Sequence, residues 1–303
     1  MIGKIGRALE HPAILPGLLL AGAVFVSAQV ANAASGYPLA AYDSHAYHLA
    51  AGSSAPYAAT IDAGFDDSVS PYKYRYPPPL AQALWPSQFL PWPVFAGVWL
   101  ALLYLIFLAI AGRWALPLLL LFPPILGELY FGNVNLLIAL AILVGMRWPA
   151  AWDFVLLTKV TPGIGLLWFA VRGEWRSFAI ALGTTAVVAL GSFVLAPPLW
   201  FDFRRALDVQ SEAVTVVPQL AIQVSLPIRL AIAAVVVVLA ARTDRVWLVP
   251  VAATIAAPVL WINVLVVLIA AIPLAEGRTT TLWPRRSRAA AAIGAVPAGT
   301  GPD

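Results

Sequence analysis

The chain has 303 residues, of which 61% are hydrophobic and 11% are charged, and its formal net charge is +4. Soluble proteins carry about 25% charged residues, so this composition excludes a soluble globular protein. The absence of cysteine excludes disulfides and thiolate chemistry, and no basic, aromatic-interleaved stretch indicates a nucleic-acid partner. Several apolar runs approach the ~20 residues of a helical span and lack the alternation of barrel strands. The sequence therefore predicts an all-α, polytopic transmembrane helical bundle.

The first apolar run covers residues 13–30 and follows Lys4 and Arg7. Positive charges before a first span place the N-terminus on the cytoplasmic side. Residues 31–33, Ala-Asn-Ala, look like a signal-peptidase site, but the run is long for a signal peptide, so we favour a retained helix. Either way, the next segment lies outside the cytoplasm.

Residues 34–92 form the longest polar stretch and are predicted to be an outer loop after the first helix. The stretch is too short for an independent domain with a large core. We expect it to lie across the membrane face as amphipathic helices and loops, ended rigidly by the three prolines at residues 77–79.

About 8–10 hydrophobic segments are expected by the length rule, all within one integral membrane domain of residues 1–276. Two segments, residues 148–171 and 246–274, contain a turn signal, and each either crosses once or turns back. Counting positive charges favours the returning path. It places four arginines inside and two outside: Arg172, Arg176, Arg242 and Arg245 inside, and Arg204 and Arg205 outside. Both paths leave the C-terminus inside, and the basic, then Ala/Gly-rich residues 277–303 are predicted to be a disordered cytoplasmic tail.

Lys159 lies in the middle of a stretch that is otherwise apolar apart from Asp153. A buried ammonium is costly in hydrocarbon, so it needs a partner or an anionic ligand. Pro162 breaks the helix three residues later and frees backbone groups to line a cavity. We predict that Lys159 contacts a lipid-linked phosphate at the membrane boundary. The alternatives are an ion pair with Glu128 or with Asp153, whose six-residue separation is a poor same-face spacing.

Asp43 and Tyr47 are four residues apart in the outer loop and share a face on a helix. A carboxylate beside a phenol could serve as a general base; the alternative is a helix N-cap. His45 and His48 have a spacing that suits two metal ligands, but no third ligand is evident. We therefore expect interfacial histidines and no metal.

The segment Tyr-Lys-Tyr-Arg-Tyr-Pro-Pro contains Lys73, Arg75 and Tyr76. Its alternation predicts an extended strand with both bases on one face. Two cations beside lipid headgroups could bind phosphate. The alternative is an interfacial belt with snorkelling basic side chains.

Glu128 lies near a predicted helix C-terminus, where the helix dipole disfavours a negative charge, so we expect it to have a compensating partner or a role. In the sequence Gly132-Asn133-Val134-Asn135, Gly132 allows a tight turn, and Asn133 is predicted to cap the following helix.

Polar groups from four separate segments are predicted to converge on the outer face, which indicates a pocket. These groups are the outer loop, Glu128 with Asn133 and Asn135, Lys159, and Asn263 with Trp261.

An ordered set of short motifs resembles glycosyltransferase family 87, the integral-membrane GT-C enzymes that use polyprenyl-phosphate sugars. The set covers about residues 43–176, with weaker similarity around Trp261. Its members are Asp-x-x-x-Tyr at 43–47 followed by Ala-Ala at 50–51, Tyr-Pro-Pro at 76–78, Trp-Pro at 85–86, Gly-Asn-Val-Asn at 132–135, Lys-x-x-Pro at 159–162, and an Arg/Trp-rich turn at 172–176.

The resemblance implies a GT-C-like fold in the cell membrane with an extracytoplasmic active site. Asp43 would deprotonate the acceptor hydroxyl, and the sugar would leave a polyprenyl phosphate with inversion. Lys159 and Arg75 would lie near the phosphate, where fixed cations stabilise the departing charge. Phosphate is itself a good leaving group, so neither a metal nor another cofactor is expected. The candidate substrate-binding residues are Tyr47, Arg75, Tyr76, Glu128, Asn133, Asn135, Lys159 and Asn263.

Three features depart from the family pattern. Asn133 replaces the usual glutamine, Asn263 follows Trp261 where many members have histidine, and the chain is short for the family. The missing histidine affects contacts with the donor, and the short length affects acceptor recognition.

We therefore expect a membrane hexosyltransferase that moves a monosaccharide, such as mannose, from a polyprenyl-phosphate donor to a glycolipid or glycan acceptor outside the cytoplasm. One alternative is a lipid or solute transporter, because broken helices with polar groups at depth also suit transport. No internal repeat is evident, which speaks against it. The other alternative is a non-catalytic membrane protein that binds glycolipid.

Overall fold

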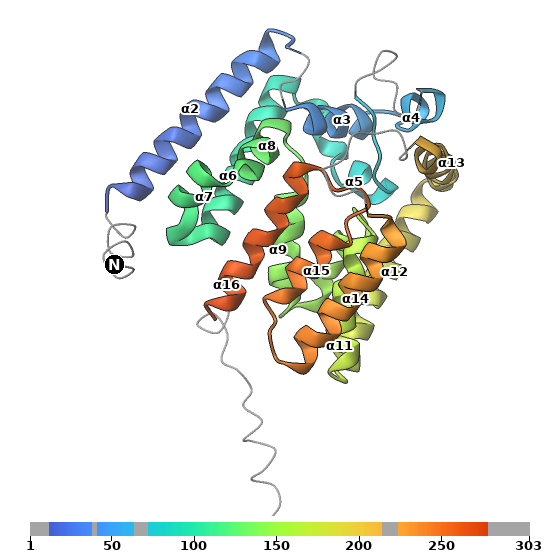
Figure 1. The fold of residues 1–303 in the computed structure, drawn as a ribbon. Helices are drawn as coiled ribbons and strands as arrows, with labels where there is room; N and C mark the ends of the chain where they lie inside the picture. Colours follow the sequence, from blue (N-terminus) through green and yellow to red (C-terminus); the bar gives the residue numbers. More distant parts are fainter. Residues whose placement is uncertain (1–11, 38–40, 64–71, 214–223, 278–303) are drawn as a thin grey trace, which may run out of the picture.

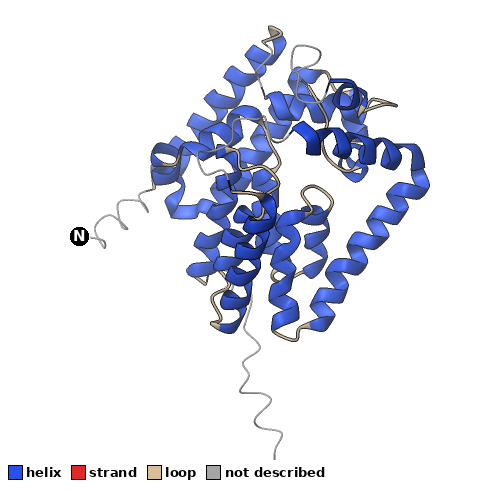
Figure 2. Cartoon of the chain, turned by 45° about the vertical axis from the view of Figure 1, so that its right-hand side comes forward, coloured by secondary structure: helices blue, strands red, loops and turns tan. Residues whose placement is uncertain are grey.

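The computed structural model describes residues 12–37, 41–63, 72–213 and 224–277. Within these ranges the chain is helical and contains no strand (Figure 2), so the predicted all-α class is confirmed. The predictions for Lys4, Arg7 and the tail from residue 278 onward concern residues outside these ranges.

Three helices are long and apolar enough to cross a membrane. They are α2 (Ile14–Ala34), the run Trp92–Leu121 that joins α6 (Trp92–Ala111) and α7 (Ala115–Leu121) through η2 (Gly112–Trp114), and α12 (Trp175–Leu195). A fourth span is possible if α8 (Pro123–Phe131) and α9 (Asn135–Gly145), which meet at 109°, are taken together. The other apolar segments are shorter or broken.

The polar outer loop folds into short helices that cover one end of the bundle, at the top of Figure 1. We call this end the cap. Its helices are α3 (Tyr42–Ala51), α4 (Ala58–Ala63), α5 (Pro78–Ala83) and η1 (Trp85–Phe89), with α13 (Pro197–Ala213) packed beside α4. The expectation that this loop forms helices and turns over one face is therefore confirmed.

The segment after α9 follows the returning path. It contains η3 (Pro149–Ala151), α10 (Trp152–Leu156), η4 (Thr161–Leu166) and α11 (Leu167–Val171). Lys159, in the break after α10, bonds to Asn135 at the start of α9. Helix α11, which ends next to Arg172, lies at the end far from the cap (Figure 1). The chain therefore runs toward the cap as far as Lys159 and then returns to the opposite end.

A second returning segment follows α14 (Leu226–Arg242). It contains α15 (Leu248–Ile255), η5 (Ile262–Ala270) and α16 (Ala271–Ala275). Arg229, in the first turn of α14, bonds to the end of α15, and Glu276, after α16, bonds to Arg113 beyond α6. Helices α8 and α9 both pack against η5, so this second segment completes the centre of the bundle.

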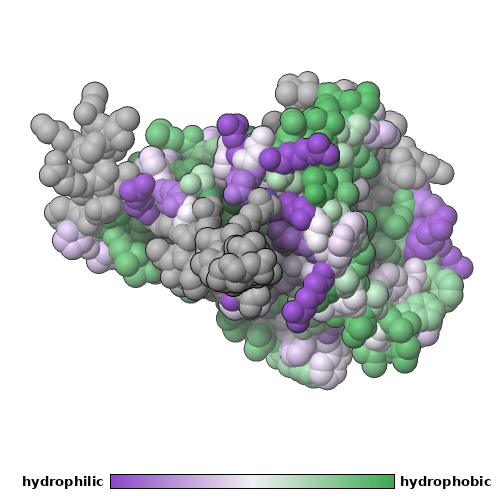
Figure 3. Space-filling model, turned by 90° about the horizontal axis from the view of Figure 1, so that it is seen from below, coloured by the Kyte–Doolittle hydropathy of each residue, from purple (hydrophilic) through white to green (hydrophobic). Residues whose placement is uncertain are grey.

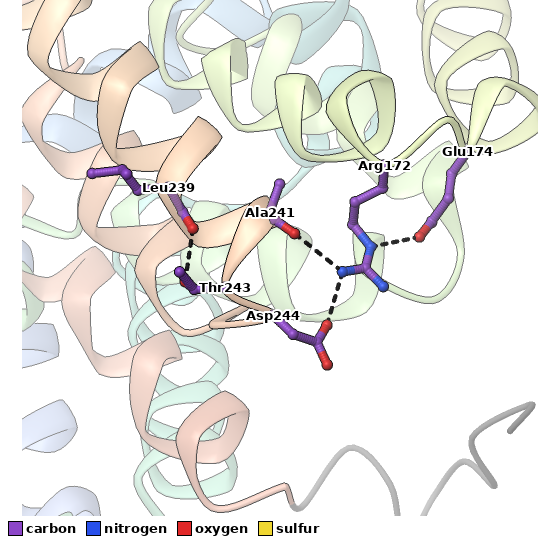
Figure 4. A network of polar contacts seen from close by, with 6 residues as sticks. All are labelled: Arg172, Glu174, Leu239, Ala241, Thr243 and Asp244. Atoms are coloured by element: carbon purple, nitrogen blue, oxygen red, sulfur yellow. Dashed lines mark hydrogen bonds and ion pairs between the residues drawn. The ribbon is translucent and has the colours of Figure 1, made fainter. Parts of the chain in front are cut away.

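The end opposite the cap is held by ion pairs. The Arg172 guanidinium lies 2.9 Å from Glu174 and 2.8 Å from Asp244, and it also donates to the Ala241 carbonyl (Figure 4). This network joins the α11–α12 turn to the α14–α15 turn. Hydrophilic side chains gather on this end, with hydrophobic ones around them (Figure 3), which is the pattern of a helical bundle whose sides face lipid.

Helix α2 packs along α6 through a close contact at Gly22 (Figure 1). A Cβ atom at position 22 would lie 2.2 Å from a ring carbon of Tyr104. The Tyr104 hydroxyl donates to the Leu18 carbonyl at 2.7 Å, and Gln29 donates to the Tyr130 carbonyl at 3.3 Å. The small residue therefore allows α2 to approach the ring, as is common between helices in membranes.

Replacing Gly22 with valine is expected to separate α2 from α6. The new side chain displaces the Tyr104 ring and breaks its bond to Leu18, at a cost of about 1–3 kcal/mol. Thermal unfolding in detergent measures this loss. Gly17→Val in the same helix is the matched control, because no atom lies within 4 Å of a Cβ placed there. Equal stability of the two variants would contradict the packing described here.

Candidate active site

Helix α3 directs Asp43 and Tyr47 toward the turn between α8 and α9. Asn133 donates to the Asp43 carboxylate at 2.8 Å. The Tyr47 hydroxyl bonds to the Tyr76 hydroxyl at 3.2 Å, and that hydroxyl donates to Asn133 Oδ1 at 3.4 Å. Three separate segments, the α3 helix, the chain before α5 and the α8–α9 turn, therefore meet in one polar cluster.

Gly132 allows the α8–α9 turn to lie against α3. Its φ angle is +67°, in the left-handed region that glycine adopts most easily. A Cβ atom there would also lie 2.7 Å from Ser44 Oγ. Trp99 of α6 donates to the Gly132 carbonyl at 2.8 Å. Turn geometry and close packing together require glycine beside Asn133.

A second polar cluster lies around Glu128, whose side chain is fully buried. One carboxylate oxygen accepts the backbone N–H of Leu136 at 3.1 Å. The other accepts the amides of Asn135 at 2.9 Å and Asn263 at 3.3 Å. Asn135 in turn accepts a hydrogen bond from the Lys159 ammonium at 2.6 Å. The Glu128 carboxylate thus holds two asparagines, one of which orients the lysine.

The expectation that Glu128 has a compensating partner is confirmed, but the predicted cap of the next helix is wrong. Helix α9 has Val134 at its N-cap, and the one backbone N–H that Asn133 Oδ1 accepts among the described residues is that of the adjacent Val134, at 2.8 Å. Glu128 accepts an N–H of the first turn of α9 instead. A carboxylate is favoured at this position because the helix N-terminus carries partial positive charge.

In the part of the chain that it describes, the structure contains neither of the two ion pairs that were the alternatives for Lys159. Among the described residues, no ion pair joins Lys159 to Asp153 or to Glu128. Lys159 reaches Glu128 through the Asn135 amide. Asp153 lies in the first turn of α10, whereas Lys159 lies beyond the other end of that helix.

The site residues divide by accessibility. Asp43, Arg75, Tyr76 and Lys159 are partly exposed, whereas the other five are buried. The buried ones are Tyr47, Glu128, Asn133, Asn135 and Asn263. The arrangement therefore consists of accessible charged and phenolic groups that rest on a buried layer of hydrogen-bonded side chains.

The charges of this site act on one another across the chain. Burial raises the pKa of Asp43, while the hydrogen bond from Asn133 and the positive charges of Lys159 and then Arg75 act in the opposite direction. A carboxylate with a raised pKa is a better proton acceptor near neutral pH.

The segment that carries Arg75 and Tyr76 forms no strand, contrary to the alternation of its sequence. Residues of α4 and the preceding turn hold it: Tyr57 donates to the Tyr76 carbonyl at 2.7 Å, and Thr60 donates to the Tyr74 carbonyl at 2.9 Å. Tyr57 and Thr60 did not emerge from the sequence, because no local pattern links them to a segment some fifteen residues later.

The two histidines of α3 face away from this site. The His45 ring stacks on Trp92 at 4.0 Å between centroids and lies 4.1 Å from Tyr72, while His48 stacks on Phe95 at 5.0 Å. Within the described ranges, no group of three His, Asp or Glu side chains is placed to hold a metal ion. The histidines attach α3 to the start of α6.

A hollow in the described surface lies elsewhere, between α12 and α13. None of the nine site residues lines it; its lining consists of Ala186, Ala189, Leu190, Phe193 and Trp200. The predicted pocket around Asp43 and Lys159 therefore stays a prediction.

The fold and the site define a helical membrane protein with a cluster of carboxylate, amide and cationic side chains at one end. The model of glycosyltransferase family 87 matches residues 74–292, which is more than half of the chain. The chain therefore belongs to glycosyltransferase family 87. No curated protein and no solved structure matches it. The matched region includes every site residue from Arg75 onward, and Asp43 and Tyr47 precede it.

Replacing Glu128 with glutamine is expected to destabilise the protein by about 1–3 kcal/mol, because a buried donor then lacks an acceptor. Glutamine presents an amide nitrogen where Asn135 and Asn263 now donate. If Asn135 rotates to compensate, Lys159 loses its acceptor. Thermal unfolding measures the loss, and Asp62→Asn, at an exposed carboxylate of α4, is the control with little expected effect. A Glu128→Gln protein as stable as this control would show that the buried hydrogen bonds are unimportant.

Acid is expected to destabilise the α3–α6 contact through His45. Burial, and then the neighbouring His48, lower the pKa of His45 from 6.5 to about 4. The unfolded chain therefore takes up a proton at a pH where the folded protein does not. Its contribution to stability is complete above pH 6.5 and falls as the pH drops from 6.5 toward 4.

The test compares the melting temperatures of the parent protein and of His45→Phe between pH 7 and pH 5. Phenylalanine keeps the ring contacts and does not titrate, so the parent should lose more stability than the variant over this range. Parallel curves would contradict the assignment to His45.

Proposed function

We propose that the chain is an inverting hexosyltransferase that transfers a monosaccharide, such as mannose, from a polyprenyl-phosphate donor to a hydroxyl of a glycolipid or glycan. The observation that carries the proposal is the pairing of an accessible carboxylate, Asp43, with accessible cations, Lys159 and Arg75, in a chain of a glycosyltransferase family. Asp43 precedes the family match, so its role rests on its position in the site.

In this mechanism Asp43 takes the proton of the acceptor hydroxyl as the oxygen attacks the anomeric carbon. The bond from that carbon to the phosphate oxygen breaks, and its electron pair leaves with the polyprenyl phosphate. Lys159 and Arg75 stabilise the negative charge of the leaving group, as fixed cations do in a site with little water. Attack opposite the leaving group inverts the anomeric configuration.

The buried layer supports each of these roles. Asn133 orients the Asp43 carboxylate, and Asn135 orients the Lys159 ammonium. These asparagines are two residues apart where α9 begins. The same helix end therefore positions both the base and the cation. Such preorganisation supplies much of the catalysis in transfer reactions.

We further propose a multi-pass orientation in the cell membrane with the cap outside and both termini in the cytoplasm. The returning paths of residues 148–171 and 246–274 support it, because the first brings Arg172 to the end opposite the cap and the second brings Glu276 to Arg113 beyond α6. A cytoplasmic excess of arginine is the usual arrangement.

Replacing Asp43 with asparagine is expected to lower turnover about 100-fold or more, since a general base contributes about 10²–10⁴-fold. Binding of polyprenyl phosphate should change little, whereas Lys159→Gln should weaken it. The assay uses purified protein in lipid vesicles, a synthetic polyprenyl-phosphate mannose and a panel of glycolipid acceptors, with released polyprenyl phosphate as the readout. Asp62→Asn, at an exposed aspartate of α4, is the matched control.

Turnover by folded Asp43→Asn at the parent rate would remove the proposed base. Tight binding of polyprenyl phosphate by the parent protein without any transfer would instead favour a non-catalytic glycolipid-binding protein.

A further inference from the structure

Arg229 is a buried cation that the sequence analysis did not single out. Only 5% of the residue is exposed, and it lies in the first turn of the apolar helix α14. Its guanidinium donates to four backbone carbonyls: Val224 at 3.0 Å, Ile255 at 3.2 Å, Ala257 at 2.5 Å and Pro258 at 3.0 Å. Among the described residues, none of its partners is a carboxylate.

These bonds leave Arg229 little capacity for an anion. A guanidinium has five N–H donors, and four hydrogen bonds to carbonyls use most of them. A phosphate ligand would have to displace the backbone. Arg229 therefore differs from Lys159 and Arg75, which stay partly exposed, and its function is to hold the chain.

The chain that Arg229 holds is the break between α15 and η5. The last carbonyls of a helix lack N–H partners and carry partial negative charge. Inside an apolar bundle such carbonyls must be satisfied by the protein. Arg229 supplies both the donors and the opposite charge for residues 255–258, so the chain can turn here without water.

Asn263 stands five residues after Pro258, at the start of η5. Its amide donates to Glu128, which also accepts from Asn135, and Asn135 holds Lys159. Residues 259–262 therefore connect the segment that Arg229 holds to Asn263 through the backbone.

We propose that Arg229 is a positioning residue for the active site: it fixes the turn that brings Asn263 to Glu128 and thereby the donor side around Lys159. The effect on catalysis rests on the proposed function, whereas the effect on the turn does not. A displacement of about 1 Å can cost about 100-fold in rate, so a variant that folds with a loosened turn should lose about tenfold or more in kcat.

The first test observes the turn itself. The chain has no cysteine, so Ile262→Cys, at a side chain that is 48% exposed next to Asn263, accepts a single nitroxide spin label. Electron paramagnetic resonance should show an immobile label in the parent background and a mobile one with Arg229→Gln. Arg229→Lys keeps the charge with three donors and should be intermediate. A label at Val187→Cys, on the exposed surface of α12, is the control that should not respond.

The second test measures coupling. If Arg229 acts through Asn263, the double variant Arg229→Gln/Asn263→Ala should transfer sugar at the rate of Asn263→Ala alone, within about twofold. Independent effects would multiply, as they do for sites that do not interact. A general loss of folding would lower the rate of the double variant below that of either single variant.

An immobile label and unchanged turnover in folded Arg229→Gln would overturn the proposal, as would multiplicative effects in the double variant. If no form transfers sugar, the proposed function fails, and label mobility still decides whether Arg229 holds the turn. If Arg229→Gln does not fold, Arg229→Lys carries both tests, and an unchanged label and rate in that variant count against the proposal.

Discussion

The site depends on the hydrogen bonds accepted by one buried carboxylate, Glu128. Its two oxygens accept a backbone N–H of α9 and the amides of Asn135 and Asn263. A buried carboxylate is expensive unless its oxygens are satisfied and a positive charge is near. Here the N-terminus of α9 and Lys159, one amide away, supply that compensation. Removing the carboxylate would therefore release two asparagines, a helix end and a lysine together.

Glu128 and Arg229 both bond to backbone groups at helix ends, and they do so with opposite charges. Each stands where a helix stops inside an apolar bundle and leaves backbone groups without partners. The carboxylate accepts an N–H at the N-terminus of α9, and the guanidinium donates to carbonyls at the C-terminus of α15. Both choices match the helix dipole. Broken helices leave backbone groups without partners within the helix, and the two charged side chains satisfy them.

The sequence predicted the helical class, the cap and the returning segments, because these follow from hydrophobic length, charge bias and proline. It also predicted that Asp43, Glu128, Asn133 and Lys159 converge; the hydrogen bonds of the structure join Asp43 to Asn133, and Glu128 through Asn135 to Lys159. The hydrogen-bond partners of individual residues were harder to predict from the sequence. Local capping preferences predict that Asn133 accepts an N–H at the start of α9. Glu128 accepts that of Leu136 instead, because tertiary contacts override local preferences.

The role of Arg229 is not visible in the sequence. In the sequence it is one arginine at the start of an apolar helix, where a snorkelling side chain that reaches the interface is the ordinary expectation. Three of its four partners lie 26 to 29 residues later, in backbone carbonyls that no side-chain pattern reveals. A buried cation without an acidic partner is informative only when its acceptors are known. Once they are known, the absence of a carboxylate separates a residue that shapes the site from one that contacts the phosphate, a distinction that charge alone cannot make.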